Sequence, residues 1–74
     1  MRYYVTRTNV MTGSVHYLRH NPPKWSSVIF ESAYGKARCG KYRKKFANRH
    51  VRRLNAMLNP LMRKNIIYGL EAAE

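Results

Sequence analysis

The N-terminal stretch decides the fold class, and residues 2–20 are RYYVTRTNVMTGSVHYLRH. Residues 2–9 are rich in β-branched and aromatic side chains, and an extended chain places Tyr3 and Val5 on one side, opposite Tyr4. Thr12-Gly13 predicts a turn, after which residues 14–20 resume the extended pattern. We therefore predict an antiparallel β-hairpin over residues 2–20.

The segment after the hairpin contains the stop signal and the densest apolar patch of the first half. Asn21-Pro22-Pro23 ends the strand ladder, because proline has no N–H to donate. Trp25 is the predicted core anchor, and Val28-Ile29-Phe30 is a candidate third strand. Ser32 is suited to cap a helix that we predict over residues 33–47.

Residues 48–58 have two interpretations. In one, the helix continues to Leu58, and residues 47, 51, 54 and 58 form one apolar stripe at helical spacing. In the other, Asn48 ends the helix and residues 50–54 form a strand against the hairpin. We favour the strand, because a two-stranded hairpin is poorly stable alone.

The last part of the chain carries a helix start signal, Asn59-Pro60, with asparagine at the N-cap and proline at the first helical position. It predicts a short C-terminal helix over residues 60–70. Together these elements predict a small single α+β domain over residues 1–74, with a hairpin or three-stranded sheet, one basic helix and one short helix.

The strongest functional signal is a run of positive charge in a chain whose formal net charge is +12. Residues 35–53 contain nine lysines or arginines and no carboxylate. On a helix, residues 38, 41, 45 and 49 fall on one stripe, with Tyr42 and Phe46 beside it. The nine candidate binding residues are Lys36, Arg38, Lys41, Arg43, Lys44, Lys45, Arg49, Arg52 and Arg53.

One-signed charge of this density is typical of a surface that binds phosphates. A solvated helix ordinarily mixes signs through Glu–Lys pairs, and this run has none. We therefore predict a non-enzymatic protein that contacts DNA or RNA phosphates without base specificity, since no helix-turn-helix or zinc-finger pattern is present. The alternatives are an acidic surface on a protein partner, and a face that is only solvated.

Other chemistry has little support in this sequence. Cys39 is the one cysteine, which excludes an internal disulfide and suits a reducing, cytoplasmic setting. His16 and His20 would lie about 13 Å apart along a strand, too far for one metal ion. With three carboxylates in the chain, paired acid–base catalysis is not indicated. We expect no cofactor and no metal.

The remaining expectations concern the hairpin tyrosines, the membrane and assembly. Tyr3, Tyr4 and Tyr17 are expected to pack in the core or across strands rather than to stack on bases. The apolar clusters are too short to span a bilayer, and no run of signal-peptide length follows the N-terminus. We expect a monomer with no membrane partner.

The layout also resembles a known group of proteins. The features that carry the resemblance are the opening RYYVTR and MTGSVHY segments, Trp25, and the helix start FESA with Lys36-Ala37. Together they resemble the small hairpin-plus-helix proteins that are abundant among bacteriophage early genes. Some members bind host RNA polymerase and inhibit or redirect transcription, so the resemblance implies an acidic protein surface such as host RNA polymerase as an alternative partner.

Overall fold

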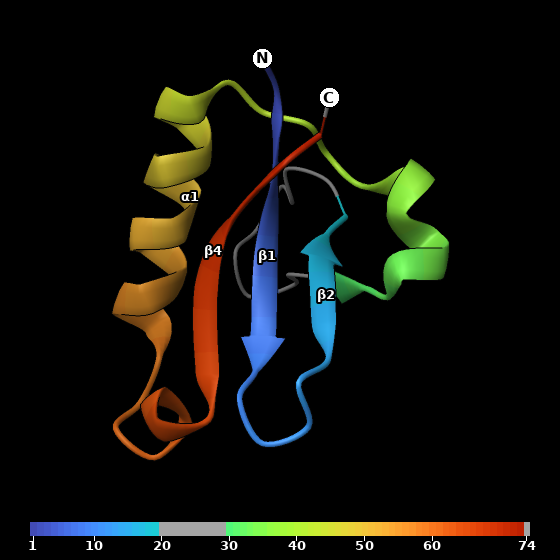
Figure 1. Ribbon diagram of the computed structural model, residues 1–74. Helices are drawn as coiled ribbons and strands as arrows, with labels where there is room; N and C mark the ends of the chain where they lie inside the picture. Colours follow the sequence, from blue (N-terminus) through green and yellow to red (C-terminus); the bar gives the residue numbers. More distant parts are fainter. Residues whose placement is uncertain (20–29, 74) are drawn as a thin grey trace.

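The computed structural model describes residues 1–19 and 30–73, which form one four-stranded sheet and three helical segments. The strands are antiparallel and lie in the order β3-β2-β1-β4, so the predicted α+β class is confirmed. Figure 1 shows α1 beside β4, and both termini at the same end of the molecule. The elements are β1 (Tyr3–Asn9), β2 (Val15–Leu18), β3 (Phe30–Glu31), η2 (Ala33–Arg38), α1 (Lys44–Met57), η3 (Met62–Lys64) and β4 (Ile66–Ala72).

The N-terminal hairpin forms as predicted. β1 and β2 pair in the register Thr6 to Tyr17, and the turn between them is stabilised by Asn9. The Asn9 side-chain oxygen accepts hydrogen bonds from the backbone N–H groups of Met11 (3.0 Å) and residue 12 (3.3 Å). Gly13 has a φ of 74°, a conformation that glycine adopts without a steric penalty.

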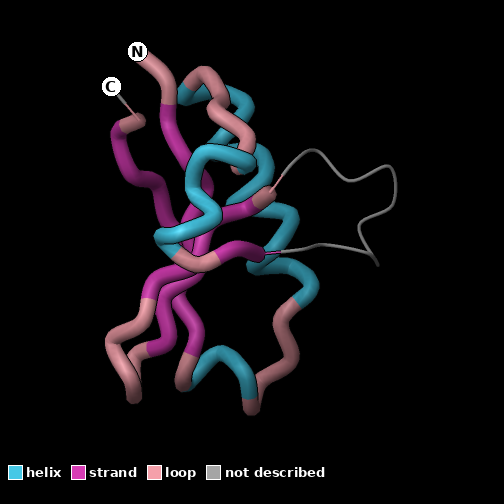
Figure 2. Tube along the Cα trace, turned by 90° about the vertical axis from the view of Figure 1, so that its right-hand side faces the viewer, coloured by secondary structure: helices cyan, strands magenta, loops and turns pink. Residues whose placement is uncertain are grey.

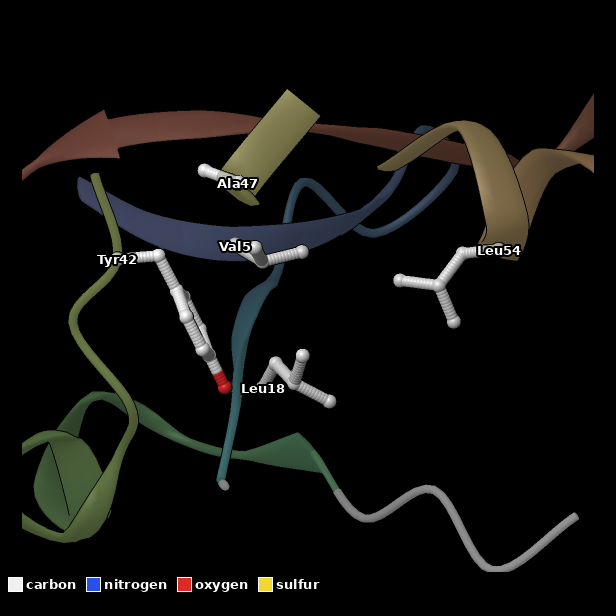
Figure 3. Close-up of a cluster of buried hydrophobic side chains, with 5 residues drawn as sticks. All are labelled: Val5, Leu18, Tyr42, Ala47 and Leu54. Carbon is white, nitrogen blue, oxygen red and sulfur yellow. The ribbon is translucent and has the colours of Figure 1, made fainter. Parts of the chain in front are cut away.

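The two faces of the sheet are covered differently. On one face, α1 packs against Val5 and Leu18, and Figure 3 shows these side chains with Tyr42, Ala47 and Leu54. On the other face, Tyr4, Tyr17 and Cys39 form a second buried cluster against η2. The alternation expected for residues 3–6 is therefore correct, because Tyr3 and Val5 share the α1 face while Tyr4 lies on the opposite face.

The basic helix predicted over residues 33–47 is wrong in its boundaries. The chain forms the short 3₁₀ helix η2, leaves helical geometry at Cys39 (φ −85°, ψ 151°), and begins α1 only after Arg43. Tyr42 interrupts the helix because its backbone exchanges two 2.8 Å hydrogen bonds with Tyr3. Gly40 permits this crossing, since a Cβ there would overlap the Tyr42 hydroxyl. Ser32 occupies the N-cap position of η2, but its side chain makes no cap hydrogen bond.

The favoured strand over residues 50–54 is also wrong, and the helical interpretation of residues 48–58 is correct. α1 runs from Lys44 to Met57 and buries Ala47 and Leu54, with Leu58 buried directly after it. Val51 packs against the same cluster. This spacing of four and three residues places the apolar side chains on one helical face, and a strand would have split them between two faces.

The C-terminal helix predicted over residues 60–70 is replaced by a single 3₁₀ turn and a strand. The Asn59 side-chain oxygen accepts the N–H of Met62 at 2.9 Å and closes a turn before η3, whose N-cap position is Leu61. The turn ends at Lys64, and β4 then pairs with β1 along its whole length, from Asn9–Ile66 to Tyr3–Ala72. The extra strand that the hairpin needs is thus β4. Figure 2 places the short η3 turn at the same end of the molecule as the β1–β2 turn.

The predicted third strand is borne out at its last residue, since Phe30 and Glu31 form β3 and pair with Leu18 and Tyr17. Trp25, the predicted core anchor, and Val28-Ile29 lie outside the described residues.

Candidate nucleic-acid interface

The side of α1 that faces away from the sheet carries a row of positive charge. Lys45, Arg49 and Arg52 are separated by four and three residues, so they share one face of the helix. This face is opposite the buried Ala47 and Leu54, and all three basic side chains are exposed. Lys44 and Arg53 flank the row and are also exposed. We call these five residues the basic face of α1: Lys44, Lys45, Arg49, Arg52 and Arg53.

The structure divides the nine predicted binding residues into three groups. Lys36 and Arg38 lie on η2, on the other face of the sheet, and Lys41 and Arg43 lie in the connection before α1. The basic face of α1 contains the remaining five. The predicted stripe of Arg38, Lys41, Lys45 and Arg49 is therefore wrong, because the helix that would align these residues is interrupted at Cys39.

Lys36 is engaged in an internal cluster. Its ammonium lies 2.6 Å from a carboxylate oxygen of Glu71 and sits over the rings of Tyr4 (5.0 Å) and Tyr17 (4.7 Å). The hydrogen bond to Glu71 raises the pKa of Lys36, and the same bond lowers the pKa of Glu71. The Tyr17 hydroxyl also donates to Glu71 at 3.1 Å. Lys36 therefore has a structural role that competes with binding a partner.

The described carboxylates lie away from the basic face of α1. Glu71 is held by Lys36, and Glu31 lies 3.7 Å from Arg19. Glu31 lies on β3, Glu71 lies on β4, and the sequence of α1 contains no acidic residue. The row of Lys45, Arg49 and Arg52 therefore has no carboxylate on its own helix to offset its charge.

An exposed aromatic ring borders the basic face. Phe46 is 45% exposed, and the Arg49 guanidinium lies 5.5 Å from its ring centroid. Tyr42, which was also predicted to lie beside the positive stripe, is buried in the core. Interruption of the predicted helix separates these two aromatic residues, and only Phe46 stays accessible to a partner.

The hairpin tyrosines pack as predicted. Tyr4 and Tyr17 are buried and meet edge to face, with ring centroids 5.4 Å apart. Burial is the main reason that the pKa of Tyr17 is raised. Tyr3 is half-buried and packs against the core beneath α1. Tyr4 and Tyr17, which Lys36 also covers, present no free ring face suited to stacking on bases.

His50 and Cys39 are used in packing. His50 meets Tyr42 edge to face at 4.7 Å, and burial, followed by the charge of Arg49, lowers its pKa. The buried Cys39 thiol lies 3.5 Å from the Gly35 carbonyl oxygen, and burial raises its pKa. Within residues 1–19 and 30–73, no three His, Cys, Asp or Glu side chains gather where they could hold a metal ion.

In the part of the chain that the structure describes, no helix has both the length and the apolar character needed to cross a membrane. No family model matches the chain, and neither the curated proteins nor the solved structures contain a significant match.

Proposed function

We propose that the protein is a small non-enzymatic binder of nucleic-acid phosphates, and that the basic face of α1 makes the contact. The observation that supports this proposal most strongly is the row of Lys45, Arg49 and Arg52 on an exposed helix with no carboxylate among its 14 residues. In free protein, these like charges repel one another, and a polyanion relieves that repulsion.

The dimensions of the row suit a nucleic-acid strand. Residues 45 and 52 are seven positions apart, which corresponds to about 10 Å along a helix. One strand of a duplex presents a charge about every 3.4 Å of axial length, so the row spans about three phosphates. Lys44 and Arg53 extend the contact at its two ends.

The start of α1 adds a second favourable feature. The N-cap residue Arg43 makes no side-chain cap hydrogen bond, and the first turn contains no acidic residue. The first N–H groups of a helix carry partial positive charge, which Lys44 and Lys45 increase instead of offsetting. A phosphate near this end would accept from the backbone N–H groups and pair with the lysines. The positive charge at the start of α1, which is unfavourable in the free protein, would then stabilise the complex.

Base specificity is not part of this proposal. Lysine and arginine contacts to phosphates position a protein on nucleic acid and carry no sequence information by themselves. Phe46 offers one ring for stacking on an unpaired base, so a modest preference for single strands fits the same face.

The experiment that tests the proposal is a titration of ¹⁵N-labelled protein with a mixed-sequence DNA duplex, a single strand and an RNA hairpin. We expect amide shifts concentrated in residues 43–53, of similar size for different duplex sequences. Shifts confined to η2, or none at low salt, would contradict the proposal.

A pull-down from lysate, with and without nuclease, separates the two partner classes. Nucleic-acid binding predicts that captured partners disappear after nuclease treatment. A large enzyme such as host RNA polymerase that is retained after nuclease would favour the alternative, in which the basic face binds an acidic protein surface.

A further inference from the structure

The outer edge of β4 is a long unpaired strand edge. β4 has seven residues and lies at the end of the sheet, whereas β3 at the other end has two. Among the described residues, β1 is the only strand that pairs with β4. β4 contains neither proline nor lysine, two of the residues with which proteins protect an exposed strand edge.

The hydrogen-bond pattern identifies the backbone groups that point outward. The N–H of Ala73 donates to Arg2 at 2.8 Å, and the N–H of Val10 donates to Asn65 at 2.8 Å. Together with the antiparallel register, these bonds show that the backbone N–H and C=O groups of residues 67, 69 and 71 point toward β1. The N–H and C=O groups of the other residues point away from the sheet, and these residues are Ile66, Tyr68, Leu70 and Ala72.

A groove runs beside the first half of this edge. It has a volume of about 500 Å³, is open to solvent, and lies between the C-terminal half of α1 and β4. Figure 1 shows the two elements side by side at this end of the molecule. The groove is lined by Asn55, Ala56, Leu58, Arg63, Ile66, Ile67 and Tyr68. An extended segment that adds to a strand edge beside a helix uses this kind of space.

The charge around the groove selects among occupants. Arg63 lines it, and Arg52 lies one turn before Ala56 on the same helix. Glu71, the one carboxylate of β4, is on the opposite face of the sheet and pairs with Lys36. A second copy of the chain would bring another net charge of +12 to this edge, which opposes self-pairing. An acidic segment is therefore favoured.

We propose that the outer edge of β4 accepts an extended acidic segment of a partner protein as an additional antiparallel strand. Its main chain pairs with the outward groups of residues 66, 68, 70 and 72. Successive side chains point to opposite faces, so carboxylates on one face lie toward Arg63, which lines the groove. Apolar side chains on the other face lie beside Ile67, which is 58% exposed. Arg52 also belongs to the basic face of α1, but the proposal does not rest on the nucleic-acid role.

The test uses the acetylated, amidated heptapeptide Glu-Val-Glu-Val-Glu-Val-Glu and its Lys-Val counterpart. In an NMR titration at low salt, we expect the acidic peptide to shift amides of residues 66–72 and 55–56, and the Lys-Val peptide to bind at least tenfold more weakly. Equal binding of both peptides, no binding of the acidic peptide, or shifts confined to Lys45 and Arg49 would overturn the proposal. The last outcome would mean that the peptide acts only as a polyanion.

N-methylated peptides test the main-chain contact without changing the protein. In an antiparallel added strand, the glutamate N–H groups point at β4 and the valine N–H groups point to solvent. Methylating the glutamate nitrogens should weaken binding at least tenfold, and methylating the valine nitrogens should change it less than threefold. Equal effects of the two modifications would overturn the proposal.

A matched pair of variants tests the position of the site. Arg63→Glu should weaken binding of the acidic peptide at least fivefold, because Arg63 lines the groove. Arg38→Glu makes the same charge change on η2, on the other face of the sheet, and should have an effect below twofold. Equal weakening by both variants would show that only net charge matters and would overturn the proposal.

Discussion

Replacing Lys45 with glutamate should stabilise the free protein and weaken its binding to nucleic acid. Lys45 is the second residue of α1, in a first turn that contains no acidic residue. An acidic side chain there interacts with the helix dipole, which contributes about 0.3–1 kcal/mol. It also pairs with Arg49 four residues later, which adds about 0.2–0.5 kcal/mol. The expected gain in the free energy of unfolding is therefore about 0.5–1.5 kcal/mol.

Thermal unfolding and duplex binding measure the two effects separately. For a domain of this size, 1 kcal/mol shifts the unfolding midpoint by about 4–8 °C, so the variant should unfold about 2–12 °C above the parent. The same change removes one phosphate contact, which reduces the slope of log affinity against log salt by about 0.9 or more. Circular dichroism and fluorescence anisotropy with a 20-base-pair duplex are suitable assays.

Two control variants separate the causes. Lys45→Gln removes the phosphate contact without adding a favourable dipole interaction, so it should lose affinity with a smaller gain in stability. Arg52→Glu makes the same charge reversal far from the start of α1, and it should lose affinity without the dipole gain. If Lys45→Glu lowers the unfolding midpoint, or binds the duplex as tightly as the parent, the reasoning about the basic face is refuted.

Three further predictions concern the scaffold. Gly40→Ala should destabilise the protein by about 1–3 kcal/mol because its Cβ overlaps the Tyr42 hydroxyl, whereas Gly69→Ala should be tolerated because its nearest neighbour would be 3.6 Å away; equal unfolding midpoints would contradict this. The lowered pKa of His50 means that the unfolded state binds more protons, so stability should fall as the pH drops below the ordinary value of 6.5. Thermal unfolding from pH 7.5 to 5 should therefore show a smaller loss for His50→Gln, and parallel curves would exclude this role. Lys36→Gln should lower the unfolding midpoint while leaving the salt slope for duplex binding unchanged, and a shallower slope would place Lys36 in the interface.

The hairpin could be predicted because its signals are local. Alternating apolar and polar residues set the two faces of β1, and Gly13 marks the turn. These features act between residues close in the sequence. They therefore favour the same local conformation whether or not the rest of the chain is folded.

The break before α1 could not be predicted because its cause is a long-range contact. Tyr42 leaves helical geometry in order to exchange backbone hydrogen bonds with Tyr3, 39 positions earlier in the chain. By its local propensity Gly40 is only a weak helix former, and its close approach to the Tyr42 hydroxyl has no local signature. The predicted charge stripe failed for the same reason, since Arg38 and Lys41 precede the break.

The C-terminal strand was missed because two local signals conflicted. Asn59-Pro60 is a helix start, and the Asn59 side chain does cap a turn. Ile66-Ile67-Tyr68 favours a strand, and pairing with β1 decides in favour of that strand. The stripe of residues 47, 51, 54 and 58 gave the correct helical alternative for the preceding segment. The prediction that the hairpin needs another strand was also correct, but β4 and not residues 50–54 provides that strand.

The salt dependence of duplex binding, measured for two variants that each lose three positive charges, tests the central claim most directly. The basic face of α1 provides five contacts, so the parent should show a slope of about −4 to −5. Replacing Lys45, Arg49 and Arg52 with glutamine should leave two contacts and a slope of about −2. Replacing Arg38, Lys41 and Lys64 with glutamine should leave the parental slope nearly unchanged. Equal slopes for the two triple variants would contradict the claim, because net charge and not the basic face of α1 would then govern binding.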